Sequence, residues 1–408
     1  MPLMRSWVDS ANAPDCPFPL NNLPYGVFST GEEEPRCGVA IGDKILDCRA
    51  AESVGLLNFG DEPLFDVPFW NEVMEQGPEL WERLRNRLTG LLAEGSSSRP
   101  SVEPFLVEQA AATMHMPFLV SEYTDFYAGK HHATNVGTMF RGAENALPPN
   151  WLHIPIGYNG RASSVVVSGT DVRRPWGQLK GPNDDAPRFA PCARFDLELE
   201  MGAIVGKESD GPVTVKEADD MIFGYVLLND WSARDIQFFE SRPLGPHLGK
   251  SFATSISAWV TPLDELSAAR VPLPAHDPAP LPYLTPGEPA LGLDLDLAVH
   301  VNGELVASPP ARDLYWSPEQ MVAHLTSGGA GLRAGDLLGS GTVSGPERSG
   351  FGSMLELSWN GRDPVVLAGG ASRTWLEDGD EVVMTATAPA RDGGRVALGE
   401  VRGRIRGA

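Results

Sequence analysis

Residues 221–237 read MIFGYVLLNDWSARDIQ, an apolar run that ends in a group of polar side chains. Because apolar residues follow one another without alternation, residues 221–228 are predicted to form a strand buried on both faces. Asp230, Arg234 and Gln237 lie at the end of this strand, where a helix is predicted to begin. Arg234 and Gln237, three residues apart, would then share one helix face. Asp230 has two interpretations, a cation ligand or an ordinary helix N-cap.

Short strands joined by turns are predicted for most of the chain. Its 408 residues include 44 Gly and 36 Pro, which both disfavour helix interiors. Residues 291–301 place an apolar residue at every second position, and Asn302-Gly303 after them is typical of a tight hairpin turn. Asp294 and Asp296 fall on the other face of this strand, where solvation explains them more simply than binding. The predicted class is mainly β, of the α+β type.

Two helices are predicted by local signals. Leucines recur at three- and four-residue steps over residues 80–92, which indicates an amphipathic helix packed on a core. Ser317, Pro318 and Gln320 form the start of a second helix, with a capping box, and Gly328 follows its end.

The chain is predicted to form two domains. Residues 95–100, GSSSRP, are predicted to be a surface loop or linker, and the Pro-rich residues 271–289 an extended loop. We therefore expect a small N-terminal domain over residues 1–112, with a hairpin at Gly42-Asp43, and a larger domain over residues 113–408. No internal repeat, P-loop or GxGxxG motif is present.

The charge balance excludes some classes of partner. The chain has 32 Lys and Arg against 54 Asp and Glu, a formal net charge of −22. This sign is opposite to what nucleic acid or an anionic membrane surface would attract. The chain contains no apolar run of 18 residues, and its first residues, MPLMRSWVDS, lack the apolar region of a secretory signal. We expect no membrane partner.

The cysteines predict a reducing, cytoplasmic location. Cys16, Cys37, Cys48 and Cys192 form no CxxC pair and are too sparse for a disulfide scaffold or a thiolate zinc site.

Residues 194–201, RFDLELEM, carry a row of acidic side chains. On a strand, Asp196, Glu198 and Glu200 would share one face and repel one another. A hard divalent cation with oxygen ligands would relieve this repulsion, although a solvated strand face is about as plausible from these residues alone.

Residues 122–132, EYTDFYAGKHH, add a carboxylate and a histidine. If the segment is helical, Asp125 and His132 lie on one face, two turns apart, while His131 points elsewhere. Tyr127 would then face away, so a role for Tyr127 in the same site would require an irregular segment. A lone histidine is more often structural than catalytic, but His132 lies near an acidic residue.

Together these segments predict a divalent-cation site. Asp125, Glu198, Glu200 and Asp230 come from three segments, and the absence of a zinc-like His and Cys set favours Mg²⁺ or Ca²⁺. Four carboxylates around one divalent ion leave net negative charge, so we expect cations nearby. Lys250 and Arg234 are the candidates.

Two later segments have open interpretations. Residues 339–345, GSGTVSG, could cradle an anion with backbone N–H groups, although a tight connection is the simpler interpretation. Glu356, among alternating neighbours, is either a surface residue or the partner of a histidine.

Several long motifs resemble the fumarylacetoacetate hydrolase family. They are NLPYGVFS at 22–29, HATNVG at 132–137, MFRG at 139–142, GRASS at 160–164, LLNDWSARDIQ at 227–237, PLGP at 243–246, GKSF at 249–252 and FGSMLELSW at 351–359. They run from near residue 17 almost to the C-terminus, which makes the resemblance far more specific than any single motif.

The resemblance implies a fold, a partner and a reaction. The expected fold is an N-terminal SH3-like barrel followed by a C-terminal mixed β-roll particular to this superfamily, in a homodimer. The expected reaction is metal-dependent hydrolysis of a carbon–carbon bond in a small β-diketone acid, 4-fumarylacetoacetate, giving fumarate and acetoacetate at the last step of phenylalanine and tyrosine degradation.

The resemblance also implies roles for individual residues. His132 matches the general base and Glu356 the residue that orients it, while Arg234, Gln237 and Lys250 match the oxyanion stabilisers. The matching metal ligands are Asp125, Glu198, Glu200 and Asp230, with Lys250 and Thr254 in a second, cation-associated cluster. The matching substrate contacts are Tyr127, Arg141, Tyr158, Gln237 and Thr342.

Two positions depart from the family pattern, and two other functions remain open. Asn159 stands where the family usually has His, and Ser241 where it usually has a Tyr that contacts substrate. The Ser241 departure leaves open a related superfamily enzyme, a hydrolase, decarboxylase or hydratase of another small oxo-acid. A third hypothesis is an acidic β-rich module that binds Ca²⁺ and a ligand without catalysis; it requires no base beside the metal.

Overall fold

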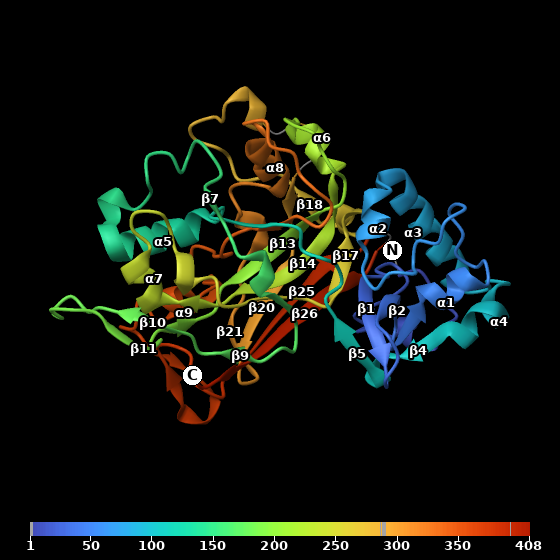
Figure 1. Cartoon of the computed structure of the whole chain (residues 1–408), viewed down its shortest axis with the longest axis horizontal. Coiled ribbons are helices and arrows are strands. Elements are labelled where there is room, and N and C mark those ends of the chain that lie inside the picture. The colour runs from blue at the N-terminus through green and yellow to red at the C-terminus, as the bar shows by residue number, and fades with distance from the viewer. Residues whose placement is uncertain (1–2, 286, 288–290, 392) are drawn as a thin grey trace.

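Sheets dominate the computed structural model, which describes residues 3–285, 287, 291–391 and 393–408 (Figure 1). The largest sheet has the strand order β4 (Leu106–Glu108), β3 (Lys44–Asp47), β2 (Arg36–Ile41), β1 (Tyr25–Thr30), β17 (Trp259–Pro262), β14 (Ile222–Asp230), β13 (Leu199–Val205), β22 (Leu337–Gly339), β6 (Tyr123–Phe126) and β7 (Gly157–Asn159). Three further strands join this sheet from the side: β5 (Ala112–His115), β8 (Val165–Val167) and β16 (Thr254–Ile256). The mainly β prediction is confirmed.

A second sheet packs against the first. Its strand order is β21 (Glu304–Ala307), β20 (Asp296–Val301), β25 (Glu381–Pro389), β26 (Arg395–Arg406) and β9 (Val172–Arg173), and both β25 and β26 contact β14. The remaining strands form pairs: β10 (Trp176–Leu179) with β11 (Arg188–Pro191), β12 (Phe195–Asp196) with β15 (Ser232–Ala233), β18 (Arg270–Val271) with β19 (Gly292–Leu293), and β23 (Val365–Val366) with β24 (Ser372–Arg373). Every residue of β14 is buried, as its unbroken apolar run predicts.

Helices join many of these strands along the chain. They are α1 (Cys48–Ser53), α2 (Asn71–Glu75), α3 (Pro78–Leu92), α4 (Arg99–Val102), α5 (Lys130–Arg141), α6 (Val215–Asp219), α7 (Arg234–Glu240), α8 (Pro318–Thr326) and α9 (Met354–Leu357). Two of the helix predictions are confirmed. The leucines of α3 face the N-terminal core, and α8 has the capping box between Ser317 and Gln320.

The N-terminal module continues into the larger sheet (blue in Figure 1). β2 and β3 form the predicted hairpin around Gly42-Asp43. β1 pairs on one side with β2, and on the other side with β17 and β5. β1 uses this second side to join β17. Among the described residues, the strand pairs therefore leave the sheet open, and the expected SH3-like barrel is not closed. The apolar core of the module extends to Ile204 and Phe223 of the central strands.

Three expectations about local structure need correction. The expected linker at residues 95–100 is shorter, because α4 begins at Arg99. The strand expected over residues 291–301 is broken into β19 and β20, because the chain changes partner from β18 to β25. The strand expected over residues 194–201 is likewise broken, between β12 and β13.

The extended loop expected over residues 271–289 is confirmed only in part, whereas the hairpin predicted at Asn302-Gly303 is confirmed. Within residues 271–289, Pro282–Leu284 form a 3-10 turn, while residues 286 and 288–289 lie outside the described part of the chain. Asn302 and Gly303 both have positive φ, 53° and 82°, as the predicted tight hairpin turn requires. Among the described helices, none is long and apolar enough to cross a membrane.

Candidate active site and metal centre

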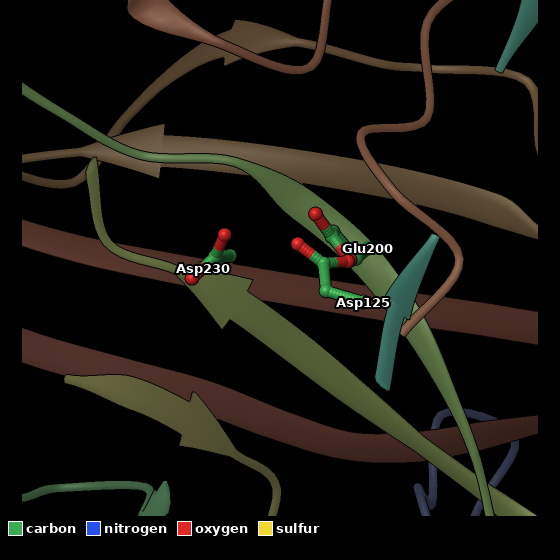
Figure 2. A group of neighbouring side chains, drawn as sticks. All are labelled: Asp125, Glu200 and Asp230. Carbon is green, nitrogen blue, oxygen red and sulfur yellow. The ribbon is translucent and has the colours of Figure 1, made fainter. Parts of the chain in front are cut away.

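Three buried carboxylates meet on the β14-β13-β22-β6 part of the large sheet (Figure 2). Asp125 lies on β6, Glu200 on β13 and Asp230 at the end of β14. The strand order β14-β13-β22-β6 brings them together, and one oxygen from each lies within 4.8 Å of the others. Their side chains are buried, with at most 3% exposure. The solvated-face interpretation of the acidic strand and the N-cap interpretation of Asp230 are therefore wrong; the residue before α7 is Ala233.

The electrostatics of this cluster fit a bound cation. Burial is the main cause that raises the pKa of Asp125, Glu200 and Asp230, and nearby negative charges add to the rise. Asp125 Oδ1 and Glu200 Oε1 have no hydrogen-bond partner among the described residues. Buried carboxylate oxygens without partners are costly unless a cation neutralises them. The donor set is all oxygen, which suits Mg²⁺ or Ca²⁺ better than zinc.

Glu198 lies beside this cluster and is held by two cations. Arg234 and Lys250 both donate to its carboxylate, and Lys250 Nζ also donates to Asp230 Oδ2 over 2.5 Å. Burial alone would raise the pKa of Glu198, but the charges of Arg234 and Lys250 outweigh burial and lower it. The structure thus brings the two expected cations to the acidic cluster. Glu198 is not one of the three residues whose oxygens converge.

His132 and Glu356 form a buried pair. His132 lies in the first turn of α5, and its Nδ1 is 2.7 Å from Glu356 Oε2 on α9. The other ring nitrogen, Nε2, lies 3.7 Å from Glu198 Oε1, so it faces the acidic cluster. The interpretation of Glu356 as a histidine partner is confirmed, and its interpretation as a surface residue is wrong because it is 1% exposed.

Three polar residues that the sequence analysis missed hold Glu356. Ser344 and Ser353 donate their hydroxyls to Oε2, and Asn135 Nδ2 donates to Oε1, each at 2.8 Å. Although burial raises the pKa of Glu356, the His132 ring and these hydrogen bonds bring it below the usual range. Asn135 could have been found from the sequence, because it follows His132 by three positions on the same helix face.

The segment that carries Asp125 and His132 is not a regular helix. Asp125 lies on strand β6, and α5 begins only at Lys130. The turn between them brings the Tyr127 ring edge-on against the His132 imidazole, with ring centroids 5.4 Å apart. We expected that Tyr127 could serve the site only if this segment were irregular. The segment is irregular, so that condition is met.

Arg234 and Gln237 share one face of α7, as predicted. Arg234 donates to Asp196 over 2.7 Å, to Glu198, and to the amide oxygen of Gln237 over 3.1 Å. Asp196 in turn accepts from the backbone N–H groups of Met354 and Leu355. Asp196 therefore links Arg234 to the helix that carries Glu356.

Several other predicted residues contact the cluster. Tyr158 donates its hydroxyl to Asp125 Oδ2 over 2.7 Å, and Thr254 Oγ1 lies 3.3 Å from Asp230 Oδ1. In the residues 339–345 loop, the backbone N–H of Gly341 donates to Glu200 Oε2, while the buried Thr342 hydroxyl has no partner among the described residues. This loop therefore contacts the site and is more than a tight connection.

Arg141 is arranged differently from the other predicted residues. It lies at the end of α5, where its guanidinium donates to the backbone carbonyls of Asn145 and Ala146. Burial raises the pKa of Tyr127, and the charge of Arg141 has a smaller effect in the opposite direction.

A cavity of about 1300 Å³ opens beside the cluster. Tyr158 and Lys250 reach it from the cluster, and Asn159, Arg161 and Phe239 line it farther out. The volume is ample for a small acid.

Comparisons with known proteins identify the family. The family described as Fumarylacetoacetate (FAA) hydrolase C-terminal matches residues 122–406, and Fumarylacetoacetase N-terminal matches residues 21–117. The chain belongs to the fumarylacetoacetate hydrolase family. The expected domain boundary between residues 112 and 113 stays a prediction.

Relatives in this family align along nearly the whole chain. The fumarylacetoacetase of Homo sapiens is 47% identical, with 96% of this chain and 97% of the relative covered. The fumarylacetoacetase of Caenorhabditis elegans is 46% identical, with 98% and 99% covered. Among solved structures, a fumarylacetoacetate hydrolase from Exiguobacterium antarcticum has a TM-score of 0.56 at 16% identity, covering 95% of this chain and all of that one. A maleylpyruvate hydrolase from Sphingobium has a TM-score of 0.51 at 18% identity, covering 95% and 100%. At such identities these two structures establish a common fold.

Proposed function

We propose that the protein is a fumarylacetoacetase, which hydrolyses the carbon–carbon bond of 4-fumarylacetoacetate to fumarate and acetoacetate in the last step of phenylalanine and tyrosine degradation. The observation that carries the proposal is the buried His132–Glu356 pair, whose free imidazole nitrogen faces a carboxylate cluster suited to a divalent ion. Relatives of this name, 47% identical over almost the full length, support the same reaction.

In the proposed mechanism, His132 Nε2 takes a proton from water while Glu356 holds the imidazole through Nδ1 and stabilises the imidazolium. The water oxygen attacks a ketone carbonyl carbon, and the carbonyl electron pair moves to its oxygen. When that pair returns, the adjacent carbon–carbon bond breaks, fumarate leaves, and the other fragment departs as an enolate that takes up a proton to give acetoacetate. The proton held by His132 is available for this last step.

The oxyanion formed by attack needs donors aimed at it. Arg234 has five N–H groups and uses three of them on Asp196, Glu198 and Gln237. Because Arg234 occupies the amide oxygen of Gln237, the NH₂ group of Gln237 is left as a donor. We assign Arg234, Gln237 and Lys250 to this role.

We propose that Mg²⁺ or Ca²⁺ is held by Asp125, Glu198, Glu200 and Asp230. Glu198 would join the three convergent carboxylates by turning from the Lys250 ammonium toward the ion, and Lys250 and Thr254 would stay with Asp230. When bound, the ion supplies a Lewis acid for the 1,3-dicarbonyl oxygens, which stabilises the departing enolate.

We assign the substrate contacts to residues around the same space: Tyr127, Arg141, Tyr158, Gln237 and Thr342. Tyr158 lies between the cluster and the cavity, and the Thr342 hydroxyl, which has no partner among the described residues, would donate to substrate.

The proposal is tested by turnover with and without the ion. Purified protein is incubated with fumarylacetoacetate and Mg²⁺ or Ca²⁺, in the presence or absence of chelator, and the loss of diketone absorbance is followed. We expect ion-dependent loss that chelator abolishes and added ion restores. No loss under any of these conditions would overturn the proposal.

A second candidate is a related hydrolase, decarboxylase or hydratase acting on another small oxo-acid. It is favoured by Asn159, which lines the cavity where the family usually has His, and by Ser241, which ends α7 where the family usually has a substrate-contacting Tyr. Product analysis separates the candidates. Carbon dioxide released without cleavage of the diketone, or water added without that cleavage, would exclude the diketone hydrolase.

We further propose a homodimer in the cytoplasm. The four cysteines carry free thiols, as expected in a reducing compartment. Trp176 and Phe189 on β10 and β11, and Phe238 on α7, expose aromatic rings, which suits contact with a second copy. Light scattering on the purified protein tests the dimer, and a monomer mass would exclude it.

A further inference from the structure

Tyr123 is buried beside the metal centre and takes no part in the mechanism proposed above. It lies on β6 two positions before Asp125, so both side chains are on the same face of the strand. The side chain is 3% exposed, and its hydroxyl makes no hydrogen bond of acceptable geometry among the described residues, although the Thr254 side chain lies near enough to lower its pKa. Burying a hydroxyl without a partner is unfavourable, because its hydrogen bonds to water are lost and not replaced. The ring packs in the apolar core of the N-terminal module, but the hydroxyl at its tip needs an explanation other than stability.

Gly339 shows where this hydroxyl lies relative to the carboxylates. A Cβ atom built on Gly339 would lie 2.9 Å from Asp125 Oδ1, 3.0 Å from Glu200 Oε2 and 3.2 Å from the Tyr123 hydroxyl oxygen. These three oxygens thus surround one small space, which only glycine leaves open. Figure 2 shows the two carboxylates of this group next to each other. Asp125 Oδ1 also lacks a partner among the described residues, so a donor and an acceptor, both unused, face the same space.

Packing fixes the direction of the hydroxyl. The Tyr123 ring lies directly against the backbone of Gly160, where a Cβ would come within 2.3 Å of a ring carbon. A phenol is protonated at neutral pH, so the hydroxyl is available as a hydrogen-bond donor. A ring held in this way cannot turn its hydroxyl out of the metal centre.

We propose that Tyr123 is a positioning residue of the metal centre, whose hydroxyl donates into the space beside Gly339 and orients the oxygens of Asp125 and Glu200 toward the ion. The inference rests on the metal centre proposed above. In the ion-free protein the hydroxyl has no hydrogen-bond partner among the described residues. Tyr123 therefore contributes to ion affinity and not to the stability of the ion-free protein.

Tyr123→Phe tests this, because it removes only the hydroxyl. Titration calorimetry of the full chain with Mg²⁺ and, separately, with Ca²⁺ measures ion affinity, and thermal unfolding measures the stability of the ion-free protein. We expect ion affinity to fall about 10- to 100-fold, the usual effect of losing a group that orients metal ligands. The melting temperature of the ion-free protein should stay the same or rise. A residue with a merely structural role would lower that temperature and leave the affinity unchanged.

Tyr225→Phe is the matched control. Tyr225 on β14 is 1% exposed, and its hydroxyl also has no hydrogen-bond partner among the described residues, but it lies near Glu319 and Arg270 rather than the three carboxylates. It should leave ion affinity unchanged. Gly339→Ala should weaken ion binding as well, because the added methyl fills the shared space.

The outcomes distinguish a failure of the proposed metal centre from a failure of the role proposed for Tyr123. If the unaltered protein binds neither ion, the metal centre is wrong and this inference falls with it. If the unaltered protein binds an ion and Tyr123→Phe binds it equally well, the metal centre stands and the role of Tyr123 is overturned. Unchanged affinity in Gly339→Ala would also overturn it, because the space would then have no use.

Discussion

The substitution Glu356→Gln probes the base most directly, since it keeps the shape of the side chain and removes its charge. Glu356 Oε2 accepts from His132, Ser344 and Ser353, and Oε1 accepts from Asn135. An amide has one oxygen, so the NH₂ group of a glutamine must face at least one of these donors. The buried imidazolium that forms during proton transfer would then lack its counter-charge.

The size of the effect follows from the geometry. His132 Nδ1 and Glu356 Oε2 are 2.7 Å apart. With delocalised charges about 4 Å apart and an effective dielectric constant of about 20, the attraction is about 4 kcal/mol. Each 1.36 kcal/mol corresponds to about a factor of ten in rate, so complete loss would lower kcat by about 10³-fold. Because hydrogen bonding to the amide oxygen can remain, we expect a fall of about 10²- to 10³-fold.

Steady-state turnover of fumarylacetoacetate measures this fall, and ion titration checks that the metal centre is intact. Glu319→Gln is the matched control, because Glu319 is equally buried but pairs with Arg270, which is not part of the site. We expect kcat of the control to match that of the unaltered enzyme. A kcat for Glu356→Gln within about threefold of the unaltered enzyme would refute the assignment of Glu356 as the residue that orients the base.

Three further predictions concern the base and the ion. His132→Ala should leave folding and ion affinity intact and lower turnover by about 10²- to 10⁴-fold, and near-normal turnover would exclude His132 as the base. Glu200→Gln should weaken ion binding in calorimetry, because it neutralises a fully buried carboxylate of the cluster, and an unchanged affinity would count against the ligand set. Burial raises the folded-state pKa of Asp125, Glu200 and Asp230 above the unfolded values of about 4. Their contribution to ion-free stability is therefore fully present below about pH 4 and is lost as pH rises through the raised values. Ion affinity should increase over the same pH range, because the carboxyl protons must leave before the ion binds. Melting curves and ion titrations at several pH values measure both effects, and an affinity that stays constant with pH would contradict the prediction.

The parts of the fold that depend on near neighbours in the chain could be predicted from the sequence. The apolar run of β14, the leucine spacing of α3, the capping box of α8 and the Asn302-Gly303 turn all match the structure. Each depends on the stereochemistry of a few consecutive residues. Strand ends at residues 194–201 and 291–301 could not be predicted, because pairing with distant strands decides where these strands break.

Residue type alone identified most of the candidate site. Asp125, Glu200 and Asp230 were singled out because each is acidic in a segment predicted to be ordered, and all three are brought together. The sequence could not distinguish the position of Glu198, which lies between Arg234 and Lys250, or that of Arg141, whose guanidinium binds nearby carbonyls. Such pairings depend on which side chains reach the same space.

The sequence by itself determined the class of the protein: mainly β, acidic, with carboxylates for a hard cation and motifs of one family. Only the tertiary structure decided which groups act together. His132 and Glu356 are 224 positions apart, and they meet because α5 and α9 pack against each other. The unpartnered hydroxyl of Tyr123 beside Gly339 is also visible only in three dimensions. Local patterns record backbone preferences, whereas proton transfer and ion binding depend on distances of a few ångströms that only the packed chain sets.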